Sequence, residues 1–372
     1  MPLNGLVMSR NTTVATVENG VTIDLKIDLA PYLLQNSNLD AWLRSRVIDK
    51  HRVNARLLKK ALRLNGADDI DVVLKFNAAT ITDTYWWRPE GSDLRYEDIR
   101  FTANHFDELA LRGDIKSINN PESRTPELTN IGSFEKCWRI DGGEWWLHKR
   151  GNAAELFSEL FISKLGAALG FEMAEYRIED GCIKSRDFTH GAEVNFEAAE
   201  GIVGTNEEYA VNFERFHDLS PELAEQYLRI IYLDTLVFNV DRHTQNYGIL
   251  RDVETGAPLK MTPNYDNNIA LLAGGGVSET VASRDLLVDL YAELLTSDAR
   301  ARTMAARFPT PPRDLVEQCI ADTNAELDAP MDAERVCGRV CDIIMNRAAA
   351  VEIAMAQTIA QTQSREPEMT IE

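Results

Sequence analysis

Three side chains capable of metal binding or proton transfer follow an apolar segment in "LVFNVDRHTQNYGILRD", residues 236–252. They are Asp241, His243 and Asn246. A carboxylate where a helix gives way to a loop can accept a hydroxyl proton, and an amide oxygen shortly after it can bind Mg²⁺. Phosphoryl transfer from a nucleotide requires metal ligands, a cation on the phosphates and a carboxylate aimed at the attacking hydroxyl. The spacing therefore predicts a phosphoryl-transfer loop with these three residues as its catalytic candidates.

Magnesium also needs a charged oxygen ligand, and the candidate is Asp266 in "TPNYDNN". Two short strand-like runs, "YGILRD" and "LKMT", flank "VETGAP" between this segment and the first loop. A hairpin there can return Asp266 to the loop that carries Asn246. We therefore take Asn246 and Asp266 as the candidate metal ligands.

The candidate phosphate cation is Lys149 in "WWLHK". Strand alternation puts Trp145, Leu147 and Lys149 on one face, so the amine emerges from an apolar wall. The helix that follows offers Glu155 and Glu159 as carboxylate partners for this lysine.

A short turn upstream, in "TNIGSFEK", contains Gly132, Ser133 and Lys136. Backbone N–H groups in such a turn can approach phosphate oxygens. Each candidate also has a simpler explanation: an aspartate in an ion pair at a helix end, an asparagine capping a turn, a lysine at an exposed strand edge. Their occurrence together and in this order favours phosphoryl transfer.

Local signals predict the elements that must position these groups. Hairpins are expected at the turns Asp141-Gly142-Gly143 and Asp180-Gly181, with a helix in "AAELFSELFISKLGAALG" between them. Ser220 followed by Pro221 indicates the start of a series of helices. The predicted division is an N-terminal module (1–120), a strand-rich lobe (121–215), a helical lobe (216–362) and a flexible tail (363–372), with a polar linker around 115–130.

One helix is predicted from about 39 to 64, because apolar residues recur there at helical spacing opposite a basic face. That face contains Arg52, Arg56, Lys59, Lys60 and Arg63. A face that is solvated or paired within the protein is favoured over one that docks an acidic partner.

Composition narrows the class of protein. The chain has 372 residues, 44% of them hydrophobic, which is enough for a sizeable core and two or three lobes. The formal net charge of −20 makes direct nucleic-acid binding an unfavoured function. Five cysteines without a CxxC pair indicate reduced thiols, and we expect a cytoplasmic protein without membrane-spanning or targeting segments.

These motifs resemble those of the HipA-like serine/threonine kinases, a family known from type II toxin–antitoxin systems. "NVDRHTQNYG" is similar to the family's catalytic loop, "TPNYDNN" to its metal-binding segment, and "TNIGSFEKCW" to its phosphate loop. "WLHKRG", followed by the predicted helix, looks like the lysine strand and glutamate helix. The resemblance covers most of the region from about residue 80 to 350, and the catalytic loop is its most specific part.

The resemblance implies an α+β, bilobal protein-kinase-like fold, preceded here by a small mixed α/β module. It also implies ATP- and Mg²⁺-dependent phosphorylation of serine or threonine on a protein, with Asp241 as the base. In nucleotide binding, Glu159 rather than Glu155 would partner Lys149. The other nucleotide-contact candidates are Gly132, Ser133, Lys136, Arg186 and Phe188.

Regulation and partners are less constrained by the resemblance. Thr129 or Ser133 is a candidate for phosphorylation in cis, and "ALLAGGGV" after Asp266 suggests an activation-type segment. A protein substrate and an antitoxin-like protein regulator are candidate partners, but the N-terminal module differs from that of the toxin-type members. A small-molecule kinase of the aminoglycoside or choline type and a nucleotide-binding regulator without turnover are the two alternatives.

Overall fold

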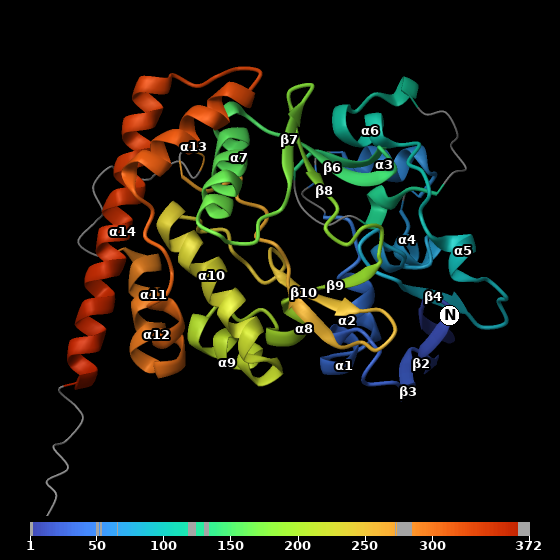
Figure 1. The fold of residues 1–372 in the computed structure, drawn as a ribbon. Coiled ribbons are helices and arrows are strands. Elements are labelled where there is room, and N and C mark those ends of the chain that lie inside the picture. The colour runs from blue at the N-terminus through green and yellow to red at the C-terminus, as the bar shows by residue number, and fades with distance from the viewer. Residues whose placement is uncertain are drawn as a thin grey trace, which may run out of the picture. The chain divides into compact units, whose positions relative to one another are not determined.

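The computed structural model describes residues 3–49, 52, 54–64, 66–117, 124–129, 134–271, 273 and 285–363. The fold is α+β, with antiparallel sheets and many helices (Figure 1). The chain forms two compact, discontinuous units. Unit 1 contains Met1–Gly151, Glu175–Gly204 and Gly248–Thr262, and unit 2 contains Asn152–Ala174, Thr205–Tyr247 and Pro263–Glu372. The three-part division predicted from the sequence stays a prediction.

Unit 1 begins with a four-stranded antiparallel sheet in the order β3-β2-β1-β4. Its strands are β1 (Gly5–Ser9), β2 (Thr12–Glu18), β3 (Val21–Leu25) and β4 (Tyr85–Pro89). Asn19 and Gly20 join β2 to β3 with positive φ values of 53° and 79°, which suit a tight hairpin turn. The described residues of this part of the chain also form short helices: α1 (Tyr32–Asn36), α2 (Leu39–Arg44), α3 (Ala55–Ala61), α4 (Asp69–Lys75), α5 (Tyr96–Ile99) and α6 (Asp107–Arg112).

The prediction of one helix from 39 to 64 is wrong, because α2 ends at Arg44 and α3 starts at Ala55. Arg46 turns inward between them, donating to the Ala78 carbonyl at 2.7 Å and to both Asp83 oxygens at 3.0 and 2.9 Å. Arg52 likewise pairs with Glu127 in the interior. Two buried arginines in this interval are satisfied by partners far along the chain, and a continuous amphipathic helix would leave them on its surface.

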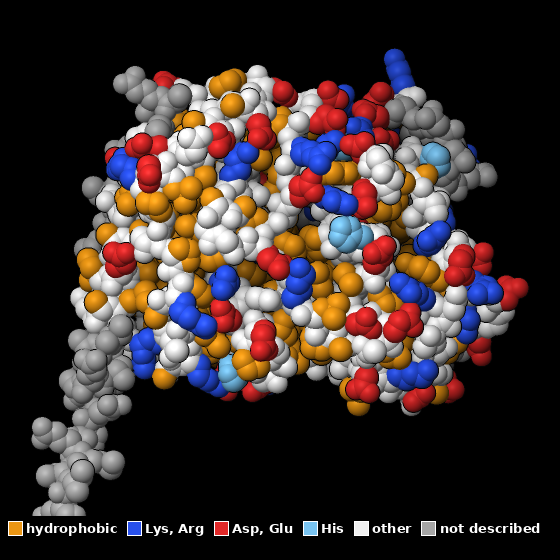
Figure 2. Space-filling view, viewed as in Figure 1, with side chains coloured by type: hydrophobic (Ala, Val, Ile, Leu, Met, Phe, Trp, Pro, Cys, Tyr) orange, Lys and Arg blue, Asp and Glu red, His pale blue; other side chains and the backbone are white. Residues whose placement is uncertain are grey.

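The basic face was predicted to be solvated or paired within the protein, and two of its residues, Arg52 and Lys59, form such pairs. Arg52 bonds Glu127 at 2.7 Å with both side chains fully buried, and Lys59 bonds Asp69 at 2.6 Å. On the face of the molecule seen in Figure 2, the Lys and Arg side chains of the described residues lie interspersed with Asp and Glu side chains.

The second sheet of unit 1 has the order β5-β6-β8-β7. Its strands are β5 (Lys136–Asp141), β6 (Glu144–Arg150), β7 (Tyr176–Glu179) and β8 (Cys182–Arg186). Both predicted hairpins are confirmed, with positive φ at Gly142 and Gly143 in one turn and at Asp180 and Gly181 in the other. The third sheet, β11-β10-β9, contains β9 (Val194–Ala198), β10 (Gly248–Asp252) and β11 (Pro258–Met261), and the short helix α8 (Glu200–Val203) follows β9.

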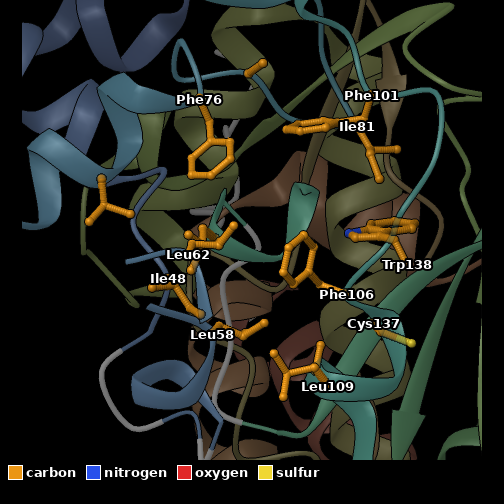
Figure 3. Close-up of a cluster of buried hydrophobic side chains, with 14 of the residues drawn as sticks. Ile48, Leu58, Leu62, Phe76, Ile81, Phe101, Phe106, Leu109, Cys137 and Trp138 are labelled. Atoms are coloured by element: carbon orange, nitrogen blue, oxygen red, sulfur yellow. The ribbon is translucent and has the colours of Figure 1, made fainter. Parts of the chain in front are cut away.

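A hydrophobic core joins the first 120 residues to the second sheet (Figure 3). Leu58, Phe76 and Phe106 lie in one cluster with Cys137 and Trp138 of β5. The polar linker predicted around 115–130 is wrong for its later part, because residues 125–129 are buried and include the short 3₁₀ helix Pro126–Thr129. Their polar groups find partners inside the protein, as the Arg52–Glu127 pair shows.

Unit 2 is helical. Its helices are α7 (Ala153–Ala168), α9 (Tyr209–Leu219), α10 (Pro221–Val237), α11 (Leu286–Ser297), α12 (Ala299–Ala305), α13 (Arg313–Glu326) and α14 (Ala333–Gln363). Helix α14 packs along α11, α13 and α10 (Figure 1). Ser220 caps α10 by accepting the Glu222 and Leu223 amides, with Pro221 at the first helical position. No helix in the described ranges is long and apolar enough to cross a membrane.

Candidate active site

The candidate catalytic loop starts where α10 ends in a left-handed turn at Phe238, with φ of 52°. The N–H groups of Phe238 and Asn239 both reach the carbonyl of Asp234, the latter at 3.0 Å. A residue in the left-handed conformation ends a helix and redirects the chain. This conformation is unfavourable for a residue with a Cβ atom. The loop from Asn239 to Tyr247 thus leaves the helix in a fixed direction.

Hydrogen bonds inside the loop fix Asp241 and Asn246 relative to each other. The Asn246 Nδ2 donates to the Asp241 carbonyl at 3.0 Å. The His243 amide donates to the same carbonyl at 2.9 Å, and the Asn246 amide donates to the His243 carbonyl at 2.8 Å. Because the nitrogen of the Asn246 amide is used as a donor, its oxygen is the atom that can bind a cation.

Arg242, which lies between these residues, is the centre of the site. Its guanidinium makes a bidentate ion pair with Asp234, at 2.8 Å from Nε and 2.9 Å from Nη2. Its Nη1 donates to the carbonyl of Asn246 at 2.7 Å and to that of Tyr265 at 2.6 Å. One side chain therefore ties the catalytic loop to the segment that carries Asp266.

Three asparagines complete a buried polar network around this guanidinium. Arg242 Nη2 also donates to the Oδ1 atoms of Asn264 and Asn267, at 3.0 and 2.8 Å. Asn239 bridges Asp234 and Asn267, at 3.1 and 3.2 Å, while Asn267 donates to Asn264 at 3.0 Å. Each of the five side chains is at most 9% exposed. These bonds connect all five side chains, although Asn264 Nδ2 has no hydrogen-bond partner among the described residues. Buried polar side chains connected in this way restrict one another's geometry.

Sequence reasoning missed Arg242, Asp234 and the three asparagines as parts of the site. One signal was present: Asp234 stands inside the apolar run "IIYLDTLVF" on α10. A carboxylate in a fully buried helical run requires a cationic or hydrogen-bonding partner. Nothing local indicated which residue would supply it.

Asp266 lies in the left-handed region as well, with φ of 61°. The charge of Asp266 acts on Asp241 and raises its pKa. The pKa of Asp241 is raised first by burial, then by Asp266 and Glu207, while His243 and Arg242 act in the opposite direction. Carboxylates gathered in this way favour either a shared proton or a bound cation.

The segment before Asp266 is held from its other side by the residues after α7. Asn264 forms a parallel β-bridge with Met173. Its N–H donates to the Glu172 carbonyl at 2.8 Å, and its carbonyl accepts the Ala174 N–H at 3.0 Å. The backbone next to Asp266 is therefore fixed at two points, this bridge and the Arg242 guanidinium.

His243 has a supporting place in the loop. Its Nδ1 accepts the Gln245 amide at 3.3 Å. The carbonyl of Gln245 in turn accepts the Tyr265 hydroxyl at 3.0 Å. Of the residues predicted from the sequence, the structure brings together Asp241, His243, Asn246 and Asp266.

The predicted nucleotide-contact residues are divided between the two units. In unit 1, Lys149 of β6 stands opposite Lys136 of β5, and both side chains are buried, at 8% and 7% exposed. Glu159 is fully buried on α7 in unit 2, and its pairing with Lys149 stays a prediction.

Two further contact candidates are engaged inside unit 1. Arg186 bonds Glu144 at 3.1 Å and Glu175 at 3.5 Å. Phe188 packs edge-on against Phe196, with ring centroids 5.6 Å apart. Their role in nucleotide binding stays a prediction.

The phosphate-loop candidates Gly132 and Ser133 lie outside the described residues, as do the glycines of "ALLAGGGV" and the tail from 364 onward. Thr129 is described and is buried, with its hydroxyl donating to the Pro126 carbonyl at 3.3 Å. A phosphate on that hydroxyl would require the turn to open.

The donor set suits magnesium better than a metal held by protein ligands alone. Within the described ranges, no group of three or more His, Cys, Asp or Glu side chains could hold a metal ion. Asn246 and Asp266 offer oxygen atoms of the kind that Mg²⁺ prefers, and this ion characteristically keeps waters and binds substrate phosphates as its other ligands. The residues present therefore fit a nucleotide-bound magnesium ion.

No protein-family model and no curated protein matches the chain. One similar solved structure is HipA of the Shewanella oneidensis MR-1 toxin–antitoxin system, in a complex with HipB and operator DNA. It has a TM-score of 0.49 and 14% identity, covering 97% of this chain and 97% of that chain. The Helicobacter pylori proinflammatory kinase CtkA is also similar, with a TM-score of 0.48 and 14% identity over 61% of this chain and 95% of that chain. Likeness of this degree assigns no activity or partner to this chain.

Proposed function

We propose that the protein is an ATP- and Mg²⁺-dependent kinase that phosphorylates serine or threonine on a protein. The observation that supports this function is the meeting of Asp241, Asn246 and Asp266 around the buried Arg242 guanidinium. A kinase site needs these three oxygen-bearing groups and little covalent chemistry from the protein.

In this proposal Asp241 accepts the proton of the substrate hydroxyl as that oxygen attacks the terminal phosphate. Its half-buried position raises its pKa, which makes the carboxylate a better proton acceptor. The Asn246 amide oxygen and the Asp266 carboxylate would hold Mg²⁺, which when bound neutralises charge on the phosphates. Lys149 would contact those phosphates, with Glu159 as its partner.

The test is phosphate transfer from labelled ATP by the whole chain in the presence of Mg²⁺. Asp241→Asn keeps the shape of the side chain and removes its ability to accept a proton, so we expect turnover to fall by roughly 10²- to 10⁴-fold. Asp342→Asn is the matched control, because Asp342 is an exposed carboxylate paired with Arg313 on the surface. Equal turnover in the Asp241→Asn variant and the wild type would refute the proposed function.

The nature of the acceptor is decided in the same reactions. Mass spectrometry of the reaction products should find phosphoserine or phosphothreonine in protein, either in this chain or in an added protein mixture. Label transferred instead to aminoglycoside or choline would establish the small-molecule alternative. ATP binding with no transfer to any acceptor would establish the regulatory alternative.

A further inference from the structure

A second buried arginine, Arg347 of α14, lies at the end of the helix that precedes the catalytic loop. Its side chain is only 3% exposed. The guanidinium donates through Nε to the carbonyl of Thr235, in the last turn of α10. It also lies over the ring of Phe238, with 4.7 Å between the guanidinium carbon and the ring centroid. Arg347 thus contacts the residues on either side of the point where α10 ends.

The same guanidinium is paired with Asp285, the residue that caps α11. Arg347 Nη1 donates to Asp285 Oδ2, and Arg347 Nη2 donates to Asp285 Oδ1 at 3.0 Å. Asp285 Oδ1 also accepts the amides of Leu287 and Val288, at 3.1 and 3.2 Å. Three helices, α10, α11 and α14, therefore meet on one side chain in unit 2.

The contacts of Arg347 fall next to those of the active-site guanidinium. Thr235 follows Asp234, the partner of Arg242, directly along α10. Tyr209 of α9 lies within the field of both arginines: burial and Asp234 raise the pKa of its hydroxyl, and Arg242 and Arg347 oppose that rise. The two buried arginines thus bond neighbouring residues in one turn of α10: Arg242 bonds the Asp234 side chain, and Arg347 bonds the Thr235 carbonyl.

We propose that Arg347, held by Asp285, is a positioning residue for the catalytic loop. It fixes the left-handed turn at Phe238, from which the loop carrying Asp241 departs. A left-handed phenylalanine is unfavourable in isolation and persists only when its surroundings hold it. Here the guanidinium covers the Phe238 ring and donates to the Thr235 carbonyl, three residues earlier in the last turn of α10. This inference rests on the proposed function only for its effect on turnover.

The first test measures the loop itself, by amide hydrogen exchange of residues 237–247 in the whole chain. Asp285→Asn retains a good helix cap and removes the charge, and Arg347→Lys retains the charge and removes the fork-shaped donor set. Arg313→Lys is the matched control, because the Arg313–Asp342 pair also joins α14 to a neighbouring helix and is about half exposed. We expect exchange in 237–247 to rise roughly ten- to a hundredfold in the first two variants and to stay unchanged in the control.

The same measurement covers the possibility that the variants are merely less stable. Exchange in α13, residues 313–326, reports on unit 2 away from the loop. A rise confined to 237–247 supports positioning by Arg347. Unchanged exchange in 237–247, or a rise of equal size in α13, would overturn the inference.

The second test is kinetic and separates this inference from the proposed function. If transfer is seen and requires Asp241, both Asp285→Asn and Arg347→Lys should lower kcat roughly tenfold or more while KM for ATP changes less than about twofold. A kcat equal to that of Arg313→Lys would overturn the inference while leaving the kinase function standing. Full activity of Asp241→Asn would overturn the kinase function, and the exchange result would still decide whether Arg347 positions the loop.

Discussion

Substitution of Asp234 by asparagine tests how the site is held together. In the native protein this carboxylate accepts two hydrogen bonds from Arg242, at 2.8 and 2.9 Å, and one from Asn239, at 3.1 Å. Its side chain is fully buried, and that of Arg242 is 3% exposed. Asparagine has the same shape but offers only one acceptor oxygen, and its NH₂ group would face a donor of the guanidinium.

The expected loss of stability follows from this geometry. Removing one partner of a buried ion pair costs about 3–5 kcal/mol, because the remaining charge stays buried. Arg242 keeps four other acceptors, the carbonyls of Asn246 and Tyr265 and the side-chain oxygens of Asn264 and Asn267. We therefore expect the lower end, about 3 kcal/mol, out of a total stability of roughly 5–15 kcal/mol. For a folding unit of 150–250 residues this corresponds to a fall in Tm of roughly 6–12 °C.

The assay is urea and thermal unfolding followed by circular dichroism, with Asp342→Asn as the matched control. That carboxylate is 54% exposed and pairs with Arg313 at 2.8 Å, so its substitution should cost no more than about 1 kcal/mol. Replacing Asp234 and Arg242 together by leucine and methionine should cost less than the sum of the single changes, because no charge is then left unpaired. An Asp234→Asn protein within about 1 kcal/mol of wild type would refute the view that this pair organises the site.

Two further predictions concern single residues of the same region. Burial and Asp266 raise the pKa of Asp241, so the acid limb of kcat/KM should lie above the ordinary aspartate value of about 4 in a pH–rate profile. For the free energy of unfolding the sign is opposite, because a carboxyl whose pKa is raised by folding makes the protein less stable as the pH rises through that pKa. Asp241→Asn removes this ionised group, so the variant should have a Tm no lower than that of the wild type at pH 7. Gly248→Ala should lower the stability by roughly 1–3 kcal/mol in the same unfolding assay, because its Cβ would lie 2.1 Å from the Glu197 carbonyl oxygen, a backbone atom of β9.

Elements with local signals could be predicted from the sequence. The two hairpins are set by residues that tolerate positive φ, and α10 is set by Ser220 and Pro221 at its start. The interval between α2 and α3 could not be predicted in this way, since Arg46 and Arg52 bond Asp83 and Glu127, partners 37 and 75 positions away. Periodicity reports which side of a helix is apolar and cannot report that two basic residues are drawn into the interior.

The candidate site shows the same division. Asp241, Asn246 and Asp266 could be chosen from their chemistry and order, because the reaction dictates the residue types. The groups that hold them could not, since the bonds from Arg242 to Asn264 and Asn267 join positions 22 and 25 apart across a hairpin. Such support is set by tertiary structure and has no fixed spacing in the sequence.

Burying the charged groups of this network costs free energy, and the two left-handed residues that flank the network explain why it is retained. Phe238 begins the catalytic loop at φ of 52°, and Asp266 lies at φ of 61° in the metal-ligand segment. Each conformation costs of the order of 1–3 kcal/mol and survives only where surrounding contacts determine it. Arg242 supplies such contacts at two places. One is Asp234, whose carbonyl accepts the Phe238 N–H, and the other is the carbonyl of Tyr265, the residue directly before Asp266. An apolar core of equal volume could match the stability of this ion pair, but it could not fix the direction of two loops at once. The ion pair is therefore explained by geometry, and its loss should disturb both strained residues together.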